Sequence, residues 1–151
     1  MSKTISYEDY LKEYGSLTYT NVGVSMLPLL KQGRDLFTVE KKSDKRCKKG
    51  DVVLYHRPPD QYVLHRVIDV LPDSYVILGD NCIAREYGIT DADILGVMTR
   101  FTRKGKSHTV SDRSYRIYTS LILHTIPFRV FCKKSAIRVK HSLKRILRKT
   151  E

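Results

Sequence analysis

The chain has 151 residues, of which 41% are hydrophobic and 29% charged, as is ordinary for one folded domain. Its formal net charge of +12 is unusual and unevenly distributed: from Arg113 onward there are eleven cations and one acid. We therefore expect a nearly neutral body, residues 1–112, followed by a tail, residues 113–151, that carries about +10.

Cysteine content and hydropathy exclude several classes of protein. Cys47, Cys82 and Cys132 are odd in number and far apart, so neither a zinc site nor a disulfide framework is expected, and no cofactor is implied. The amino terminus lacks the apolar segment of a signal peptide. The longest apolar run, residues 118–132, is too short and too interrupted to span a bilayer. We expect the protein in the cytoplasm or peripherally on a membrane.

The body is predicted to be mainly β. Residues 7–14 place Tyr and Leu side chains on one face and predict one or two helical turns. From there to about residue 110, segments rich in β-branched and aromatic residues alternate with turns that contain Gly or Pro. The predicted strands are "LTYTNV", "DLFTVEK", "DVVLYHR", "QYVLHRVIDVL", "SYVILGD", and a hairpin of "DILGVMTRFTR" with "SHTV".

The tail has a different pattern. Residues 114–132 are rich in Tyr, Leu, Ile and Phe and are interrupted at Pro127, which predicts a broken pair of helices. Beyond them, cations surround apolar residues at helical spacing, namely Ala136, Val139, Leu143, Ile146 and Leu147. Such a segment suits an anionic membrane surface as partner. A solvated basic helix on its own domain is the alternative, and nucleic acid is disfavoured because no binding fold is recognisable.

One hydroxyl, that of Ser25, lies within the apolar stretch "NVGVSMLPLL". It is either a small packed residue or a nucleophile shielded from water. A serine nucleophile needs a base within hydrogen-bond reach, usually His and sometimes a desolvated Lys. The chain has no Lys between Lys49 and Lys104, so the central strands cannot supply that base.

His65 and Asp80 are the residues that the central strands do supply. His65 lies in "YVLHRVIDV", where a buried imidazole requires a polar partner. Asp80 ends the next strand in "VILGDN" and is placed to orient such a ring. Each also has a simpler interpretation, as a core histidine and as a turn residue respectively.

Taken together and in order, these segments resemble the boxes of type I signal peptidases. "GVSMLPLL" resembles the Ser-x-Met-x-Pro box, and "RDLFTVEKK" and "KKGDVVLYHRP" the two that follow. "YVLHRVIDV" is similar to the box of the general base, "VILGDN" to the Gly-Asp-Asn box, and "DADILGVMTRF" to the closing strand with its buried Gly. The resemblance covers residues 18–104. With His as the base, it points to the branch of the endoplasmic reticulum and archaeal enzymes, which is related to the self-cleaving repressor peptidases.

The resemblance implies a coiled antiparallel β domain, residues 1–112, with residues 113–151 as a basic helical extension. It implies a serine endopeptidase in which Ser25 attacks, His65 is the base and Asp80 the supporting acid. The Ser25 N–H would bind the oxyanion. The implied substrate-binding residues are Val24 and Leu27, lining the cleft, and Met26 and Pro28, setting the turn. The expected partner is a signal or leader peptide, or a specific protein.

Two departures from the family pattern motivate an alternative function. Gly23 stands two positions before Ser25, where many members have Ser. The family also has paired acids after Gly-Asp-Asn; here Glu86, Asp91 and Asp93 are the candidates, and the sequence does not distinguish among them. The alternative is a non-catalytic, peptide-binding or regulatory member of the same fold. A self-cleaving repressor is disfavoured because the residues before the first box are too few for a helix-turn-helix domain.

Overall fold

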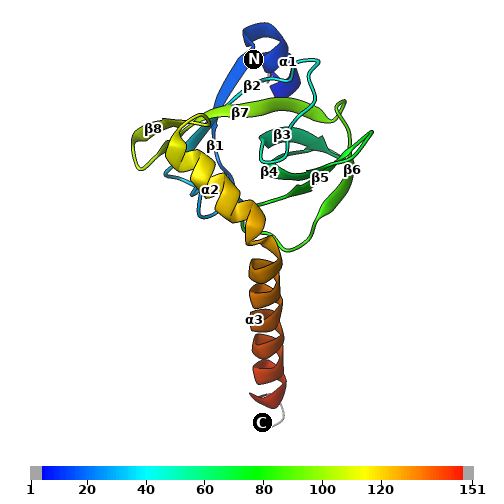
Figure 1. Ribbon diagram of the computed structural model, residues 1–151, viewed down its shortest axis with the longest axis vertical. Helices are drawn as coiled ribbons and strands as arrows, with labels where there is room; N and C mark the ends of the chain where they lie inside the picture. Colours follow the sequence, from blue (N-terminus) through cyan, green and yellow to red (C-terminus); the bar gives the residue numbers. More distant parts are fainter. Residues whose placement is uncertain (1–4, 148–151) are drawn as a thin grey trace.

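The computed structural model describes residues 5–147 and contains one antiparallel sheet with helices before and after it (Figure 1). The helices are α1 (Tyr7–Tyr14), α2 (Arg113–His124) and α3 (Ile126–Leu147). The strands are β1 (Ser16–Thr20), β2 (Leu36–Lys41), β3 (Val52–Arg57), β4 (Gln61–Val70), β5 (Tyr75–Leu78), β6 (Glu86–Ile89), β7 (Ile94–Arg103) and β8 (Lys106–Thr109). They pair in the order β1-β2-β7-β3-β4-β5-β6, and β8 pairs with β7.

The predicted mainly antiparallel β body and the helix at residues 7–14 are confirmed. Ser6 caps α1 by accepting a 3.1 Å hydrogen bond from the backbone N–H of Asp9, and Gly15 ends the helix at a φ of +75°. Leu11 is the buried residue of this helix and joins α1 to the core. Strand β6 was not predicted, because "EYGI" is only four residues long, contains Gly88 and is only partly buried.

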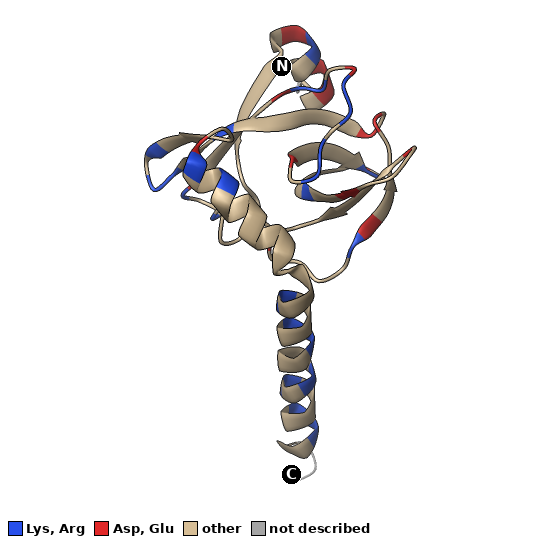
Figure 2. Ribbon diagram, viewed as in Figure 1, with Lys and Arg blue, Asp and Glu red and all other residues tan. Residues whose placement is uncertain are grey.

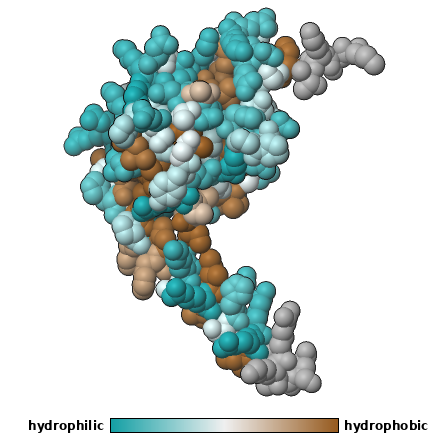
Figure 3. Space-filling view, turned by 90° about the vertical axis from the view of Figure 1, so that its right-hand side faces the viewer, coloured by the Kyte–Doolittle hydropathy of each residue, from teal (hydrophilic) through white to brown (hydrophobic). Residues whose placement is uncertain are grey.

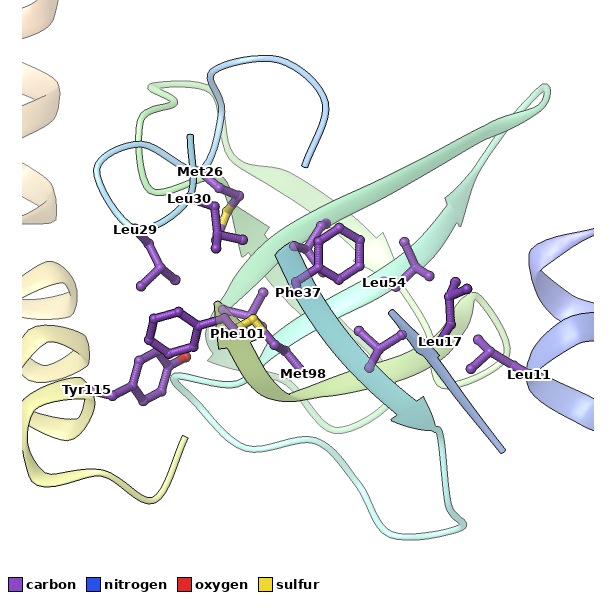
Figure 4. Packing of buried hydrophobic residues seen from close by; sticks show 13 residues of the cluster. Leu11, Leu17, Met26, Leu29, Leu30, Phe37, Leu54, Met98, Phe101 and Tyr115 are labelled. Atoms are coloured by element: carbon purple, nitrogen blue, oxygen red, sulfur yellow. The ribbon is translucent and has the colours of Figure 1, made fainter. Parts of the chain in front are cut away.

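The main core lies between the sheet, α1 and α2 (Figure 4). Three residues of the loop that carries Ser25 belong to it: Met26, Leu29 and Leu30 are almost completely buried. Figure 4 shows them on the same side as Phe101 and Tyr115. Burial of each such side chain stabilises the fold by about 1.5–3 kcal/mol, so the apolar residues around Ser25 fix its loop to the body.

The two carboxy-terminal helices differ in their packing. Helix α2 buries Tyr115 and Ile122, and Tyr115 belongs to the main core. Ile126 at the start of α3 joins a small cluster with β4 and β5. The carboxy-terminal part of α3 extends away from the body, and neither helix contains an acidic residue (Figures 1 and 2). Within residues 5–147, no helix combines the length and apolar character that a bilayer-spanning segment requires.

The tail forms two helices, but the break lies at Thr125 and not at the predicted Pro127. Pro127 is in the first turn of α3, where the N–H that proline lacks would have no partner within the helix. Proline therefore begins the second helix here. The tail expected from residue 113 coincides with the first residue of α2.

Candidate active site

Strand β4 positions two adjacent polar side chains on opposite faces of the sheet. Successive residues of a strand alternate in direction, so His65 and Arg66 point to different neighbours. His65 is 6% exposed, and Arg66 is completely buried. Each needs a polar partner on its own side, and each has a different carboxylate.

The carboxylate that contacts His65 belongs to Glu86 on β6. Glu86 Oε1 lies 3.1 Å from Nδ1 of His65. Arg57 binds Glu86 through Nε at 2.9 Å and through a second, shorter contact, and the Tyr55 hydroxyl donates to Oε1 at 2.8 Å. The acid, its two donors and the histidine therefore form one network across β3, β4 and β6.

This network determines the tautomer of His65. The Tyr55 proton is directed at Glu86, so Nδ1 of His65 carries the hydrogen that the carboxylate accepts. Within the described chain, the hydrogen bonds of the His65 ring all use Nδ1. Nε2 is thus the unprotonated nitrogen and is available as a base.

The local electrostatics keep the base neutral and the acid ionised. Burial lowers the pKa of His65 below its ordinary value, and the charge of Glu86 opposes that only in part. Burial raises the pKa of Glu86, but the hydrogen bonds from Arg57 and Tyr55 outweigh it and hold the net pKa below the usual range. Burial and the adjacent Glu86 raise the pKa of Tyr55, so its hydroxyl remains a donor.

Asp80 does not have the place expected for it beside His65. Its two oxygens accept hydrogen bonds of 2.7 and 2.8 Å from Arg66, and the Tyr118 hydroxyl donates to it at 2.8 Å. Arg66 also donates to the carbonyl of Gly50. A fully buried guanidinium requires a counterion, and Asp80 supplies it, so Asp80 is a structural partner of Arg66 while Glu86 orients the histidine.

Ser25 and His65 line the same cavity, of about 1090 Å³. Gly79 lies between the Ser25 loop and His65 of β4. A Cβ built on Gly79 would lie 2.8 Å from the carbonyl oxygen of Ser25 and 2.9 Å from His65 Nε2. Asn81 fixes this arrangement: its N–H donates to the Ser25 carbonyl at 2.7 Å, and its side chain donates to the Val24 carbonyl at 3.0 Å.

Ser25 and His65 line one cavity without a direct hydrogen bond between their side chains. Within the described chain, Ser25 Oγ and His65 Nε2 are not hydrogen-bonded to each other, and the Ser25 backbone N–H has no acceptor. Catalytic hydrogen bonds are often loose in unliganded enzymes and shorten when substrate binds. The unpaired N–H is a donor for an oxyanion beside Ser25.

The four predicted substrate-binding residues have different surroundings. Val24 is exposed and lines the cavity. Met26 is 0% exposed, so it supports the turn from within the core and cannot contact a peptide. Leu27 and Pro28, joined by a cis peptide bond, are absent from the residues that line the cavity.

Gly23 has a backbone conformation that explains its identity. Its φ is +80°, a value that L side chains rarely adopt, so a Ser at this position would be strained. Its N–H donates to Gln32 Oε1 at 2.8 Å.

A second cavity, of about 460 Å³ and lined by Tyr7, Phe37 and Leu54 among others, also reaches Ser25. Ser25 therefore lies between two cavities.

Sequence reasoning left Glu86 open and missed its donors. Asp91 is bound by Tyr75 and Lys42, and Asp93 accepts hydrogen bonds from Thr90, which leaves Glu86 as the acid at the histidine. Tyr55 and Arg57 were detectable in principle, because they alternate along β3 on the face that β4 shares with His65. Other residues of the cavity that no motif indicated are Cys82, Ile83, Ala84, Lys133, Ala136 and Ile137.

Within residues 5–147, no three His, Cys, Asp or Glu side chains lie close enough together to hold a metal ion. Comparisons of the chain with protein-family models, with curated proteins and with solved structures find no match.

Proposed function

We propose that this protein is a serine endopeptidase of the signal peptidase type, with Ser25 as nucleophile, His65 as base and Glu86 as the acid that orients the base. The observation that carries the proposal is the state of the histidine. Its Nδ1 is bound by a carboxylate, while its Nε2 is unengaged and lies beside a cavity that Ser25 also lines. Ser-His-acid catalysis requires a base in this state, with the acid on Nδ1 and Nε2 free to accept the proton.

The reaction would proceed by acyl transfer. Ser25 Oγ attacks the scissile carbonyl as His65 Nε2 takes its proton, and the Ser25 N–H binds the developing oxyanion. The imidazolium, stabilised by Glu86, then protonates the leaving amine. Water deprotonated by the same nitrogen hydrolyses the acyl-enzyme and restores Ser25.

The surroundings of Ser25 favour a peptide as substrate. The two cavities that meet there are open to solvent, and both are lined largely by apolar and aromatic side chains. A peptide lying across Ser25 would place side chains in both cavities, with its scissile bond between them. A signal or leader peptide, or an exposed segment of a specific protein, has the extended conformation that this needs.

A library of proteome-derived peptides tests the proposal without assuming a sequence preference. Wild-type protein is expected to generate new peptide termini, detected by mass spectrometry, and Ser25→Ala to lose about 10⁶-fold in rate, as removal of a serine nucleophile does elsewhere. Ser107→Ala, an exposed serine of β8, is the matched control and should cleave like wild type. Equal product patterns for wild type and Ser25→Ala would contradict the proposal.

The absence of a Ser25–His65 hydrogen bond favours a second function, binding of a peptide without cleavage. In that case the library peptides would be retained on immobilised protein but not cut. Ser25→Ala would then retain the same peptides as wild type.

A further inference from the structure

Helix α3 has a continuous apolar face that the body does not cover. Phe128 and Phe131 are 69% and 68% exposed, and three more exposed apolar residues continue the same face at helical spacing, namely Val139, Leu143 and Ile146. We call these five residues the apolar face of α3. Figure 3 shows hydrophobic side chains gathered where α3 leaves the body and continuing along it between polar ones.

The apolar face is bordered by cations along the length of the helix. Helix α3 contains seven Lys and Arg residues and no Asp or Glu (Figure 2). On a 3.6-residue period Arg138 and Arg145 lie beside the face, whereas Lys140 and Lys144 follow the side of the helix that carries Lys133. Side chains of this kind reach past an apolar stripe toward a negative surface.

The opposite side of the same helix belongs to the candidate active site. Lys133, Ala136 and Ile137 line the cavity that Ser25 and His65 share. Lys133 also binds the backbone and side-chain oxygens of Asn81, which holds the Ser25 carbonyl. One helix therefore presents cavity-lining residues on one side and an uncovered apolar face on the other.

The cations of α3 and its exposed apolar side chains together indicate which partner binds the apolar face. A second copy of α3 is disfavoured, because two helices with seven cations and no acid would repel each other. Nucleic acid would use the cations but leave two exposed phenylalanines without a role. An anionic lipid surface satisfies both, since its headgroups meet the cations and its acyl boundary receives the apolar side chains.

We propose that α3 docks on anionic membranes, lying in the plane of the interface with its apolar face inserted. The docked helix would hold the cavity at the bilayer surface, so the peptide substrate would be a segment at or near that surface. This statement about the substrate rests on the proposed peptidase function, whereas membrane docking does not.

Flotation with lipid vesicles tests docking separately from catalysis. Full-length protein is expected to float with vesicles of phosphatidylcholine and phosphatidylglycerol, to remain unbound with phosphatidylcholine alone, and to bind less at about 0.5 M than at about 0.05 M salt. Ser25→Ala should float like wild type. Failure of the proposed peptidase function therefore leaves this result unchanged.

Paired variants assign the binding to α3. Phe128→Ser with Phe131→Ser, and Arg138→Glu with Arg145→Glu, should each weaken binding to the anionic vesicles at least about tenfold. The matched controls change exposed residues of the body, Tyr87→Ser and Lys48→Glu with Lys106→Glu, and should bind like wild type. Circular dichroism confirms that each variant is folded.

Three results would overturn the proposal. They are equal binding to neutral and anionic vesicles, binding that the α3 variants do not weaken, and retention of an anionic oligonucleotide or an acidic protein by a chain that does not float with anionic vesicles. The last result would assign the cations of α3 to a different class of partner.

Discussion

Glu86 Oε1 lies 3.1 Å from His65 Nδ1, and this contact joins two residues that are 21 positions apart in the chain. Arg57 and Tyr55 hold the same carboxylate from β3. The orientation of the imidazole is therefore set by three side chains that no single sequence motif contains. Each of them can be changed without altering Ser25 or His65.

Glu86→Gln keeps the shape of the side chain and removes its charge. We expect the rate of cleavage to fall by about 10³–10⁴, because the amide no longer holds the tautomer of His65 or stabilises the imidazolium. Since Glu86 raises the pKa of His65, its loss should also move the acidic limb of the pH–rate profile to lower pH. The profile of kcat/KM on a peptide found in the library measures both effects. Glu40→Gln, an exposed acid of β2, should leave both unchanged.

The buried His65 also makes the stability of the fold depend on pH. Its pKa is lowered in the folded state, so below the unfolded value of about 6.5 the unfolded chain binds the extra proton first. We expect the neutral, buried His65 to make its full contribution to the free energy of unfolding above that pH, and this contribution to be lost as the pH falls below it. Thermal unfolding of wild type and His65→Gln at pH 7.5 and 5.5 measures this. A wild type that loses no more stability than the variant would contradict the expectation.

Asp80→Asn separates the structural role of Asp80 from the catalytic role proposed for Glu86. It leaves the fully buried Arg66 without its counterion, which should lower the free energy of unfolding by about 3–5 kcal/mol. Chemical denaturation measures the loss, and Ser25→Ala should show almost none. A loss below about 1 kcal/mol would mean that the Arg66–Asp80 pair is dispensable to the fold.

Gly79→Ala is a steric test of the cavity. Its Cβ would lie less than 3 Å from Cys82 Sγ, the Ser25 carbonyl oxygen and His65 Nε2, so one of these groups must shift. We expect cleavage to fall at least about 10²-fold, since displacements of about 1 Å at a reacting pair have that effect. Gly105→Ala is the control: its positive φ costs some stability, but nothing lies within 4 Å of the added Cβ. Normal cleavage by Gly79→Ala would place the reaction elsewhere.

The sequence was informative where local patterns decide the structure. The strand pattern predicts the body, and Ser25 and His65, both predicted from their segments, line one cavity. Local sequence does not determine which acid contacts His65, because that depends on β6 pairing with β5 and on the side to which each residue of β4 points. A guanidinium at Arg66 within an apolar strand was itself a signal that Asp80 had another partner.

The position of the break between the helices of the tail shows a second limit. A proline within a helical pattern predicts an interruption, but the chain can satisfy it by starting a new helix just before Pro127. Which outcome occurs depends on the packing of Ile126 against strands β4 and β5, and neighbours along the chain do not determine that.

The loop at Asp80 and Asn81 is held from both sides. Arg129 and Lys133 of α3 bind its carbonyl oxygens, and Asn81 in turn binds the carbonyl of Ser25. A chain cut before α3 would lose those anchors, so its loss of activity could not be attributed to the loss of a membrane contact. Ser25 and the basic helix are thus linked through this loop, and a transplanted tail from another protein would have to reproduce these two cations to leave the cavity intact.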